Sequence, residues 1–298
     1  MIRLKRRTRR PVDRPPRLRG LSVNHMLPNV LTMLALCAGV TAMRFAINGR
    51  FEAAVASIIV AAVLDALDGR IARLLNGQSR FGEELDSLSD VVSFGVAPAM
   101  ILYLWTLSGA GTLGWVAVLA LSVCAALRLA RFNSKLGQND MPAYAYNYFT
   151  GVPAPAGAGL ALLPLVLSFE IGRDPAASPW IVAPWTLVVA LLMVSWVPTF
   201  SLKGIRVPQR LVVPILVVVG LLAAALVSAP WLTLAGMGIA YVASIPWSLR
   251  EFRRLRAEAE RLQAQLAAPD PQSGPDSDLD PGSDPGPSPD SGARQPAS

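Results

Sequence analysis

Eight long apolar segments recur along this chain, and they restrict its fold more than any other feature of the sequence. They lie at roughly 28–47, 53–75, 86–107, 112–131, 154–170, 180–199, 211–228 and 230–247. A run of about 20 apolar residues is long enough to cross a bilayer as a helix. With 53% hydrophobic and 16% charged residues, the sequence predicts an all-α fold, a polytopic membrane bundle of about eight transmembrane helices.

The placement of the basic residues tests this number of spans. If the N-terminus is cytoplasmic, 24 Lys and Arg residues fall in cytoplasmic regions, and only Arg44, Arg50 and Arg173 fall on the other side. Cytoplasmic loops of membrane proteins are enriched in basic residues. The distribution therefore favours an even number of spans with both termini in the cytoplasm. Only residues 228–230 separate the last two segments. Either these segments form a tight helical hairpin, or the predicted number of spans is one pair too high.

The apolar region, residues 28–247, is predicted as a transmembrane domain between two polar tails. Residues 1–27 hold nine Lys or Arg and no long apolar stretch before a cleavage site, which indicates a cytoplasmic basic arm rather than a signal peptide. In 248–267, Leu and Phe recur at helical spacing, as in a juxtamembrane amphipathic helix on the bilayer or a short solvated helix. Residues 268–298, rich in Asp, Pro, Ser and Gly, are predicted to be a disordered acidic tail.

Charge and cysteine content narrow the possible functions. The net charge is +7. The acidic tail holds six Asp and one Arg, a net charge of −5, which leaves +12 on residues 1–267. This suits contact with anionic lipid headgroups or with a phosphate-bearing substrate. No nucleic-acid binding is expected, because the basic residues lie at membrane edges without an aromatic platform for bases. The two cysteines, Cys37 and Cys124, lie in apolar runs without metal-ligand spacing.

Four aspartates lie in or beside the apolar segments of residues 65–90. An Asp at the centre of a membrane helix costs about 2.5–3.5 kcal/mol, so such acids are functional candidates. Asp65 and Asp68 are three residues apart, and Asp86 and Asp90 are four apart, so on helices each pair shares one face. Two facing pairs would form a carboxylate cage for divalent cations. The alternative is that the acids cap helix ends at the interface, which explains four acids at paired spacings less well.

The residues between these acids favour phosphoryl chemistry. Two divalent cations can clamp the attacking and leaving oxygens of an in-line displacement at phosphorus. Gly69 lets a large ligand approach the helix backbone, Arg73 can bind a phosphate, and Gly82 precedes the second pair by one turn. The sole histidine, His25, lies in the basic arm, which excludes a phosphohistidine route. A direct displacement is therefore expected.

The acidic array resembles the signature of the CDP-alcohol phosphotransferase family. The matching positions are Asp65-x2-Asp68-Gly69-x2-Ala72-Arg73-x8-Gly82-x3-Asp86-x3-Asp90. Within that family the chain is similar to the membrane-embedded bacterial phosphatidylserine synthases. The supporting strings are PNVLT at 28–32, FGEELDSLSDVVSFGVAPA at 81–99, RLARFN at 128–133 and FTGVPAPAGA at 149–158. The resemblance covers roughly residues 24–247 and leaves both tails uncovered.

The resemblance implies a transfer of the phosphatidyl group from CDP-diacylglycerol to the hydroxyl of L-serine, with release of CMP. It implies two divalent cations, Mg²⁺ or Mn²⁺, bound by Asp65, Asp68, Asp86 and Asp90, with Asp90 as the general base and Asp86 also catalytic. Gly69, Arg73, Gly82 and Asp65 would bind the CDP moiety. It also implies an integral protein of the bacterial cytoplasmic (inner) membrane and makes a homodimer plausible. The distribution of basic residues predicts that the aspartates, and so the active site, lie at the cytoplasmic face.

The residues that recognise the acceptor alcohol are less well defined. Arg128 and Arg131, at the end of the fourth segment, are the candidates for binding a serine carboxylate, with two further residues, Lys203 and Arg206, in reserve. All four also fit ordinary cytoplasmic positive charge. Near the start of the first segment, a further pair could contact the nucleotide or cap that helix: Asn29 and Thr32.

Two rival functions remain open. A sister enzyme of the same family would use another alcohol, such as glycerol 3-phosphate or an inositol phosphate. A transporter or lipid-binding scaffold would use the intramembrane acids to bind coupling ions. No inverted repeat or pair of broken helices in the sequence points to a transporter.

Overall fold

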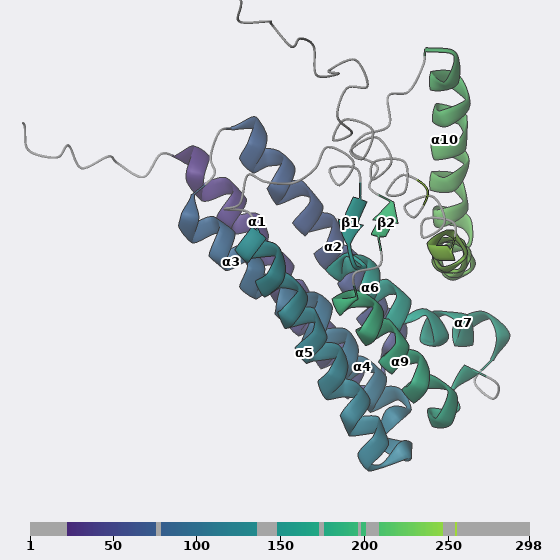
Figure 1. Cartoon of the computed structure of the whole chain (residues 1–298). Coiled ribbons are helices and arrows are strands. Elements are labelled where there is room, and N and C mark those ends of the chain that lie inside the picture. The colour runs from purple at the N-terminus through teal and green to yellow at the C-terminus, as the bar shows by residue number, and fades with distance from the viewer. Residues whose placement is uncertain are drawn as a thin grey trace, which may run out of the picture. The chain divides into compact units, whose positions relative to one another are not determined.

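The computed structural model describes residues 23–75, 79–135, 148–172, 176–195, 198–200, 209–246 and 254. The basic arm, the juxtamembrane helix and the acidic tail predicted above lie almost entirely outside these residues. The first half of the described chain contains α1 (Val23–Ile47), α2 (Phe51–Leu74), α3 (Arg80–Asp90), the π-helix η1 (Val91–Val96), α4 (Ala97–Trp105), the 3₁₀ helix η2 (Leu107–Ala110) and α5 (Thr112–Lys135) (Figure 1).

The second half is built from shorter elements. They are β1 (Tyr148–Thr150), α6 (Ala154–Ala161), α7 (Leu163–Ile171), α9 (Pro179–Val194), β2 (Pro198–Phe200), the 3₁₀ helix η5 (Gln209–Leu211) and α10 (Val212–Ser228). A further helix, Pro230–Pro246, follows α10. The last two predicted segments are thus separate helices that meet at Ala229, whose backbone leaves the helical conformation at φ −142° and ψ 74°.

The described chain is all-α, as predicted, except for one short pair of strands. β1 and β2 pair antiparallel, with Tyr148 opposite Phe200 and Thr150 opposite Pro198. The two strands immediately precede α6 and follow α9, so they join the ends of two apolar helices. Aromatic residues and threonine favour extended backbone, but runs of three residues are too short to predict as strands. The rest of the described chain is helical, as predicted.

Four described helical segments are long and apolar enough to cross a membrane. They are Met26–Ile47, Arg80–Trp105, Thr112–Ser134 and Ala154–Ile171. Three apolar helices are shorter: Pro179–Val194, Val212–Ser228 and Pro230–Pro246. Helix α2 has 24 residues and is therefore long enough, but its acidic and basic side chains set it apart from the four apolar segments. These helices are those of an integral membrane protein, and the number of eight spans stays a prediction.

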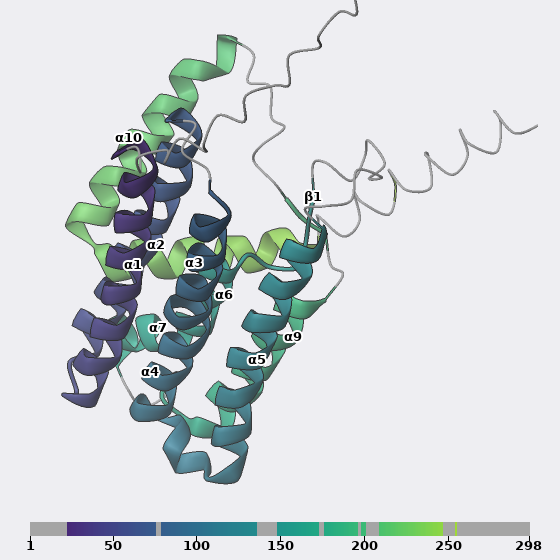
Figure 2. The ribbon, with the colours of Figure 1, turned by 90° about the vertical axis from the view of Figure 1, so that its left-hand side faces the viewer.

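Small side chains bring α1 and α2 close together. Ala35, Ala42 and Ala46 of α1 are buried, as are Ala54 and Ala61 of α2. In membranes, small residues let helix backbones approach closely, so van der Waals packing holds the helices together. Figure 2 shows α3 and α4 in line between α1 and α5, with α9 beside α5. The helices that carry the four aspartates therefore pack directly on α1.

Two serine hydroxyls fasten α3 and η1 to α1. Ser89 Oγ donates to the main-chain oxygen of Thr32 at 3.2 Å, and Ser93 Oγ donates to that of Ala35 at 3.3 Å. Gly39 makes this approach possible, because an added Cβ would lie 2.8 Å from the Ser93 Cα atom. Single-turn π-helices within α-helices occur often at functional sites, and here η1 begins directly after Asp90.

Replacement of Gly39 should test this packing. In Gly39→Ala the new methyl group would overlap Ser93, and overpacking of this kind costs about 1–3 kcal/mol. We expect a lower midpoint of thermal unfolding in detergent. The matched control is Gly236→Ala, because an added Cβ there meets no atom within 4 Å. The packing argument would be wrong if both variants unfolded at the temperature of the unaltered protein.

Candidate active site

The structure brings the two aspartate pairs together across α2 and α3. Asp65 and Asp68 lie near the C-terminal end of α2, and Asp86 and Asp90 lie in the second half of α3. One carboxylate oxygen from each of Asp65, Asp68 and Asp86 lies within 4.8 Å of the others. The facing pairs predicted from the spacing are therefore present, with three of the four acids in one group.

Asp90 lies at the edge of this group. Its carboxyl group shares a hydrogen bond with that of Asp65. Two carboxylates within hydrogen-bonding reach of each other repel unless a proton or a cation lies between them. Asp90 therefore joins the acidic group through Asp65, and the structure does not bring it into the three-residue set that lies closest together.

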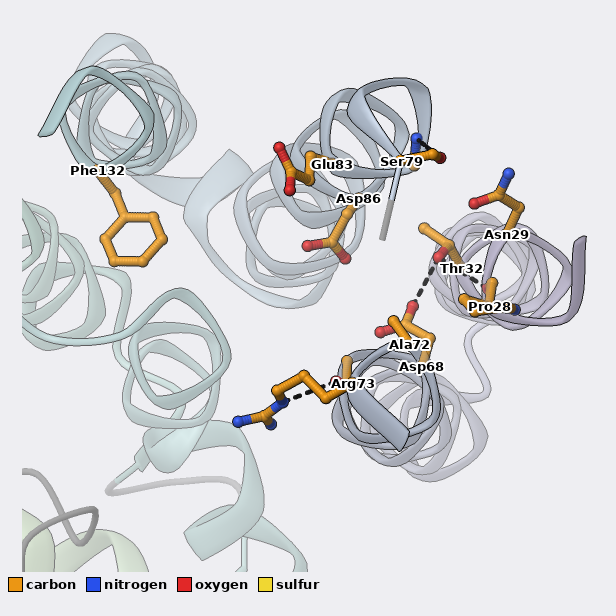
Figure 3. Close-up of a pocket in the computed structure, with 12 residues that line it drawn as sticks. Pro28, Asn29, Thr32, Asp68, Ala72, Arg73, Ser79, Glu83, Asp86 and Phe132 are labelled. Atoms are coloured by element: carbon orange, nitrogen blue, oxygen red, sulfur yellow. Dashed lines mark hydrogen bonds between the residues drawn. The ribbon is translucent and has the colours of Figure 1, made fainter. Parts of the chain in front are cut away.

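Thr32 of α1 holds Asp68 in place. Its hydroxyl oxygen lies 2.7 Å from Asp68 Oδ2 and 3.1 Å from the main-chain oxygen of Pro28. Figure 3 shows the contact with Asp68. Both Thr32 and Asp68 are only 4% exposed. The Thr32 carbonyl also accepts the hydrogen bond from Ser89, so one residue of α1 contacts both α2 and α3. The sequence suggested a nucleotide contact or a helix cap for Thr32, and neither possibility includes this link.

The acidic group fits a divalent cation. Asp86 Oδ1 is buried and has no hydrogen-bond partner among the described residues. An unsatisfied buried carboxylate oxygen is costly, and three carboxylates this close repel one another. Hard divalent cations such as Mg²⁺ and Mn²⁺ take oxygen ligands of this type. Asp65, Asp68 and Asp86 could therefore hold a cation, and the Asp86 oxygen is one free ligand for it.

An open pocket of about 420 Å³ adjoins the acids. Helices α1, α2 and α3 provide most of its lining, and Phe132 of α5 lies at one side (Figure 3). The lining residues are Pro28, Asn29, Thr32, Asp68, Gly69, Ala72, Arg73, Ser79, Gly82, Glu83, Asp86 and Phe132. Asp65 and Asp90 do not line it. Of the predicted nucleotide residues, Gly69, Arg73 and Gly82 thus share one pocket, and Asp65 lies outside it.

The two glycines of the pocket have different surroundings. An added Cβ at Gly69 would meet no atom within 4 Å, so this backbone is open to a ligand. Arg73 leaves it accessible while its Nε donates to the Gly69 oxygen at 2.9 Å. At Gly82 an added Cβ would lie 2.7 Å from Asn29 Oδ1. Gly82 is therefore also needed for the close approach of α3 to α1.

Some lining residues were not found from the sequence. Ser79 caps α3, where its hydroxyl accepts a hydrogen bond from the Gly82 amide at 3.0 Å. A serine directly before a helical segment is a recognisable N-cap signal. Phe132 lies more than 40 residues from the acids in the sequence. It falls in the string RLARFN, but no local spacing links it to the acids.

The comparisons with known proteins agree with this geometry. A family model described as CDP-alcohol phosphatidyltransferase matches residues 25–197. The chain belongs to this family. A second model, CDP-alcohol phosphatidyltransferase 2, matches residues 210–246. Both models cover apolar helices, and the first includes all four aspartates.

Several relatives of this family carry the same name. The chain is 41% identical over 249 residues to the CDP-diacylglycerol--serine O-phosphatidyltransferase of Mycobacterium tuberculosis H37Rv, covering 84% of this chain and 86% of the relative. It is 31% identical over 197 residues to the protein of that name from Helicobacter pylori 26695, covering 66% and 81%. An archaetidylserine synthase of Methanothermobacter thermautotrophicus is 36% identical over 140 residues, covering 44% and 54%.

The structure separates the two arginines proposed for the acceptor. Arg131 Nη1 donates to the main-chain oxygen of Val194 at 2.7 Å, so this side chain joins α5 to α9. Arg128 is half-buried and lies within electrostatic range of Asp90. Its Nε is buried and has no hydrogen-bond partner in the described part of the chain. The reserve residues, Lys203 and Arg206, lie outside the described residues.

Loss of the Thr32 hydroxyl should weaken cation binding. Groups that orient metal ligands typically affect metal affinity by 10–100-fold, so in Thr32→Val we expect an affinity for Mn²⁺ about tenfold lower, measured by electron paramagnetic resonance of free Mn²⁺. Thr32→Ser keeps the hydroxyl and should bind almost normally. Thr41→Val is the matched control, because Thr41 is exposed on the same helix and donates only to Cys37 O. Equal Mn²⁺ affinities for Thr32→Val and Thr41→Val would contradict the assigned role.

Proposed function

We propose that this protein transfers the phosphatidyl group of CDP-diacylglycerol to the hydroxyl of L-serine and releases CMP. The observation that carries the proposal is the three-carboxylate group beside an open pocket that also contains Gly69 and Arg73. The names of the relatives support serine as the acceptor, with 41% identity over 84% of the chain. The function is therefore that of a phosphatidylserine synthase.

The nucleotide side of the proposed site is the pocket between α1, α2 and α3. Arg73 can bind a phosphate oxygen of the CDP moiety through the guanidinium nitrogens that do not contact Gly69. Gly69 leaves its backbone open to the ligand, and Gly82 and Asn29 form the wall on the side of α1 and α3. Asp65, predicted from the sequence to bind the nucleotide, does not line the pocket. In this arrangement it acts on the nucleotide through a cation that it would share with Asp68 and Asp86.

Two divalent cations, Mg²⁺ or Mn²⁺, bound to Asp65, Asp68, Asp86 and Asp90 would offset the charge of the diphosphate and of the departing CMP. The aspartates would hold the cations at a fixed place, because the Thr32 hydroxyl orients Asp68 and the hydrogen bond from Ser89 to the Thr32 carbonyl fixes α3 on α1. Asp86 is catalytic in this proposal as a cation ligand, because its carboxylate belongs to the acidic group and its buried Oδ1 has no hydrogen-bond partner among the described residues.

The acceptor side contains Asp90 and Arg128. Asp90 accepts the proton of the serine hydroxyl while the hydroxyl oxygen bonds to the phosphorus that bears the diacylglycerol. The bond from that phosphorus to the bridging oxygen breaks, and CMP leaves with the electron pair. Arg128 attracts the serine carboxylate. No covalent enzyme intermediate is needed, so one displacement completes the transfer.

We place the site at the cytoplasmic face of the bacterial cytoplasmic membrane, with about eight spans and both termini in the cytoplasm. Three observations support this placement: the distribution of basic residues, the apolar helices, and the position of the acids near the ends of α2 and α3. In this arrangement residues 28–247 form the catalytic domain. A homodimer is part of the proposal through the family resemblance.

The acceptor can be identified with the full-length protein in detergent. CDP-diacylglycerol and Mn²⁺ are supplied together with L-serine, glycerol 3-phosphate or inositol phosphate, and CMP release is measured. We expect release with serine and the appearance of phosphatidylserine. Release with another alcohol alone would overturn serine as the acceptor, and no release with any alcohol would overturn the transferase.

Asp90→Asn should abolish the reaction. General-base catalysis contributes about 10²–10⁴-fold, so we expect CMP release to fall by at least 100-fold while the unfolding temperature is retained. Glu84→Gln serves as the control, because Glu84 is exposed on the same helix and does not line the pocket. A rate within a few-fold of the unaltered protein would remove Asp90 as the base.

A further inference from the structure

Tyr241 lies on the helix Pro230–Pro246, far along the chain from the aspartates, yet close to the acceptor side of the site. It is within electrostatic range of Arg128, which is in turn within range of Asp90. The hydroxyl of Tyr241 is buried. Three helices thus contribute one group each on this side: Asp90 from α3, Arg128 from α5 and Tyr241 from the last described helix.

These groups lie apart from the nucleotide pocket. The pocket is lined by Asp68 and Asp86 and includes none of Asp90, Arg128 and Tyr241. A direct displacement requires the acceptor and the departing CMP on opposite sides of the reacting phosphorus. The acceptor must therefore enter from the side that the nucleotide does not occupy, which is the side of Asp90.

The chemistry of this second side fits a small molecule that carries an anionic group. The Arg128 Nε is buried without a hydrogen-bond partner among the described residues, and a buried guanidinium is stabilised by a carboxylate. A phenol hydroxyl can donate to the same carboxylate or accept from an ammonium group. An amino acid has both groups, next to the hydroxyl that must reach Asp90.

The ring of Tyr241 is held by apolar contacts. It lines a separate apolar pocket of about 260 Å³ together with Ile58 and Ile59 of α2, Leu162 and Leu163, and Met237. The ring thus packs among apolar side chains, and the tyrosine lies within electrostatic range of Arg128. Removal of the hydroxyl alone should leave this packing unchanged.

We propose that Tyr241 and Arg128 together form the subsite that binds the charged end of the acceptor amino acid beside Asp90. The proposal rests on the proposed function and adds a specificity-determining residue to it. Tyr241 fixes the carboxylate or ammonium group of the acceptor, so that the acceptor hydroxyl points to Asp90. The helix Pro230–Pro246 then belongs to the active site rather than only to the membrane anchor.

The test is the steady-state kinetics of Tyr241→Phe in the full-length protein. Loss of one hydrogen bond to a charged group should raise the KM for serine about tenfold, with the KM for CDP-diacylglycerol and the Mn²⁺ affinity unchanged. A purely structural role would change all three together. Tyr103→Phe is the matched control, because Tyr103 of α4 packs edge-on against Trp115 and should give unaltered constants.

A double variant tests whether the two residues bind the same ligand. If Tyr241 and Arg128 share one acceptor, the effects of Tyr241→Phe and Arg128→Gln on the KM for serine should be non-additive when combined. Additive effects, or an unchanged KM for serine in Tyr241→Phe, would overturn the subsite while serine-dependent CMP release by the unaltered protein still supports the proposed function. If the unaltered protein does not use serine, the proposed function fails and the subsite fails with it.

Discussion

The hydrogen bond between Thr32 and Asp68 joins α1 to α2 at the place where the acidic side chains gather. Carboxylates in a group repel one another, and each is more costly beside a membrane than in water. The surrounding helices must therefore hold its members in place, and a bound cation or proton would offset their repulsion. Thr32 contacts Asp68 with its hydroxyl and Ser89 with its carbonyl, so a single turn of α1 sets the separation of α2 and α3. The close packing at Gly39 and Ser93 extends the same alignment into η1.

This arrangement makes the two sides of the acidic group unequal. Asp68 and Asp86 face an open pocket with an accessible glycine backbone and an arginine, which suits a large, phosphate-rich ligand. Asp65 and Asp90 do not line that pocket, and their carboxyl groups share a hydrogen bond. A transfer reaction needs this inequality, because the donor is a large lipid-linked nucleotide and the proposed acceptor is a small amino acid. The difference between the donor side and the acceptor side therefore depends on the positions of the aspartates along α2 and α3.

Much of the fold and of the acidic group could be predicted from the sequence, because both depend on local spacing. Apolar runs of membrane length predict helices, and aspartates at spacings of three and four predict shared faces. The links from Thr32 to α2 and α3 could not be predicted, since they join residues 36 and 57 positions apart. The π-helix and the β1–β2 pair were missed for a different reason: each is too short to leave a periodic pattern.

Arg128 and Arg131 show where local spacing stops being informative. They are three residues apart on α5, so the sequence assigns them to one face and to one possible role. The guanidinium of Arg131 reaches the main-chain oxygen of Val194 at the end of α9, whereas Arg128 lies near Asp90. What distinguishes them is the neighbouring helix, and that neighbour is set by the packing of α5 on α9 and η1. In the proposed function, specificity for the acceptor alcohol thus depends on contacts between distant helices, while the transfer step depends on one local motif.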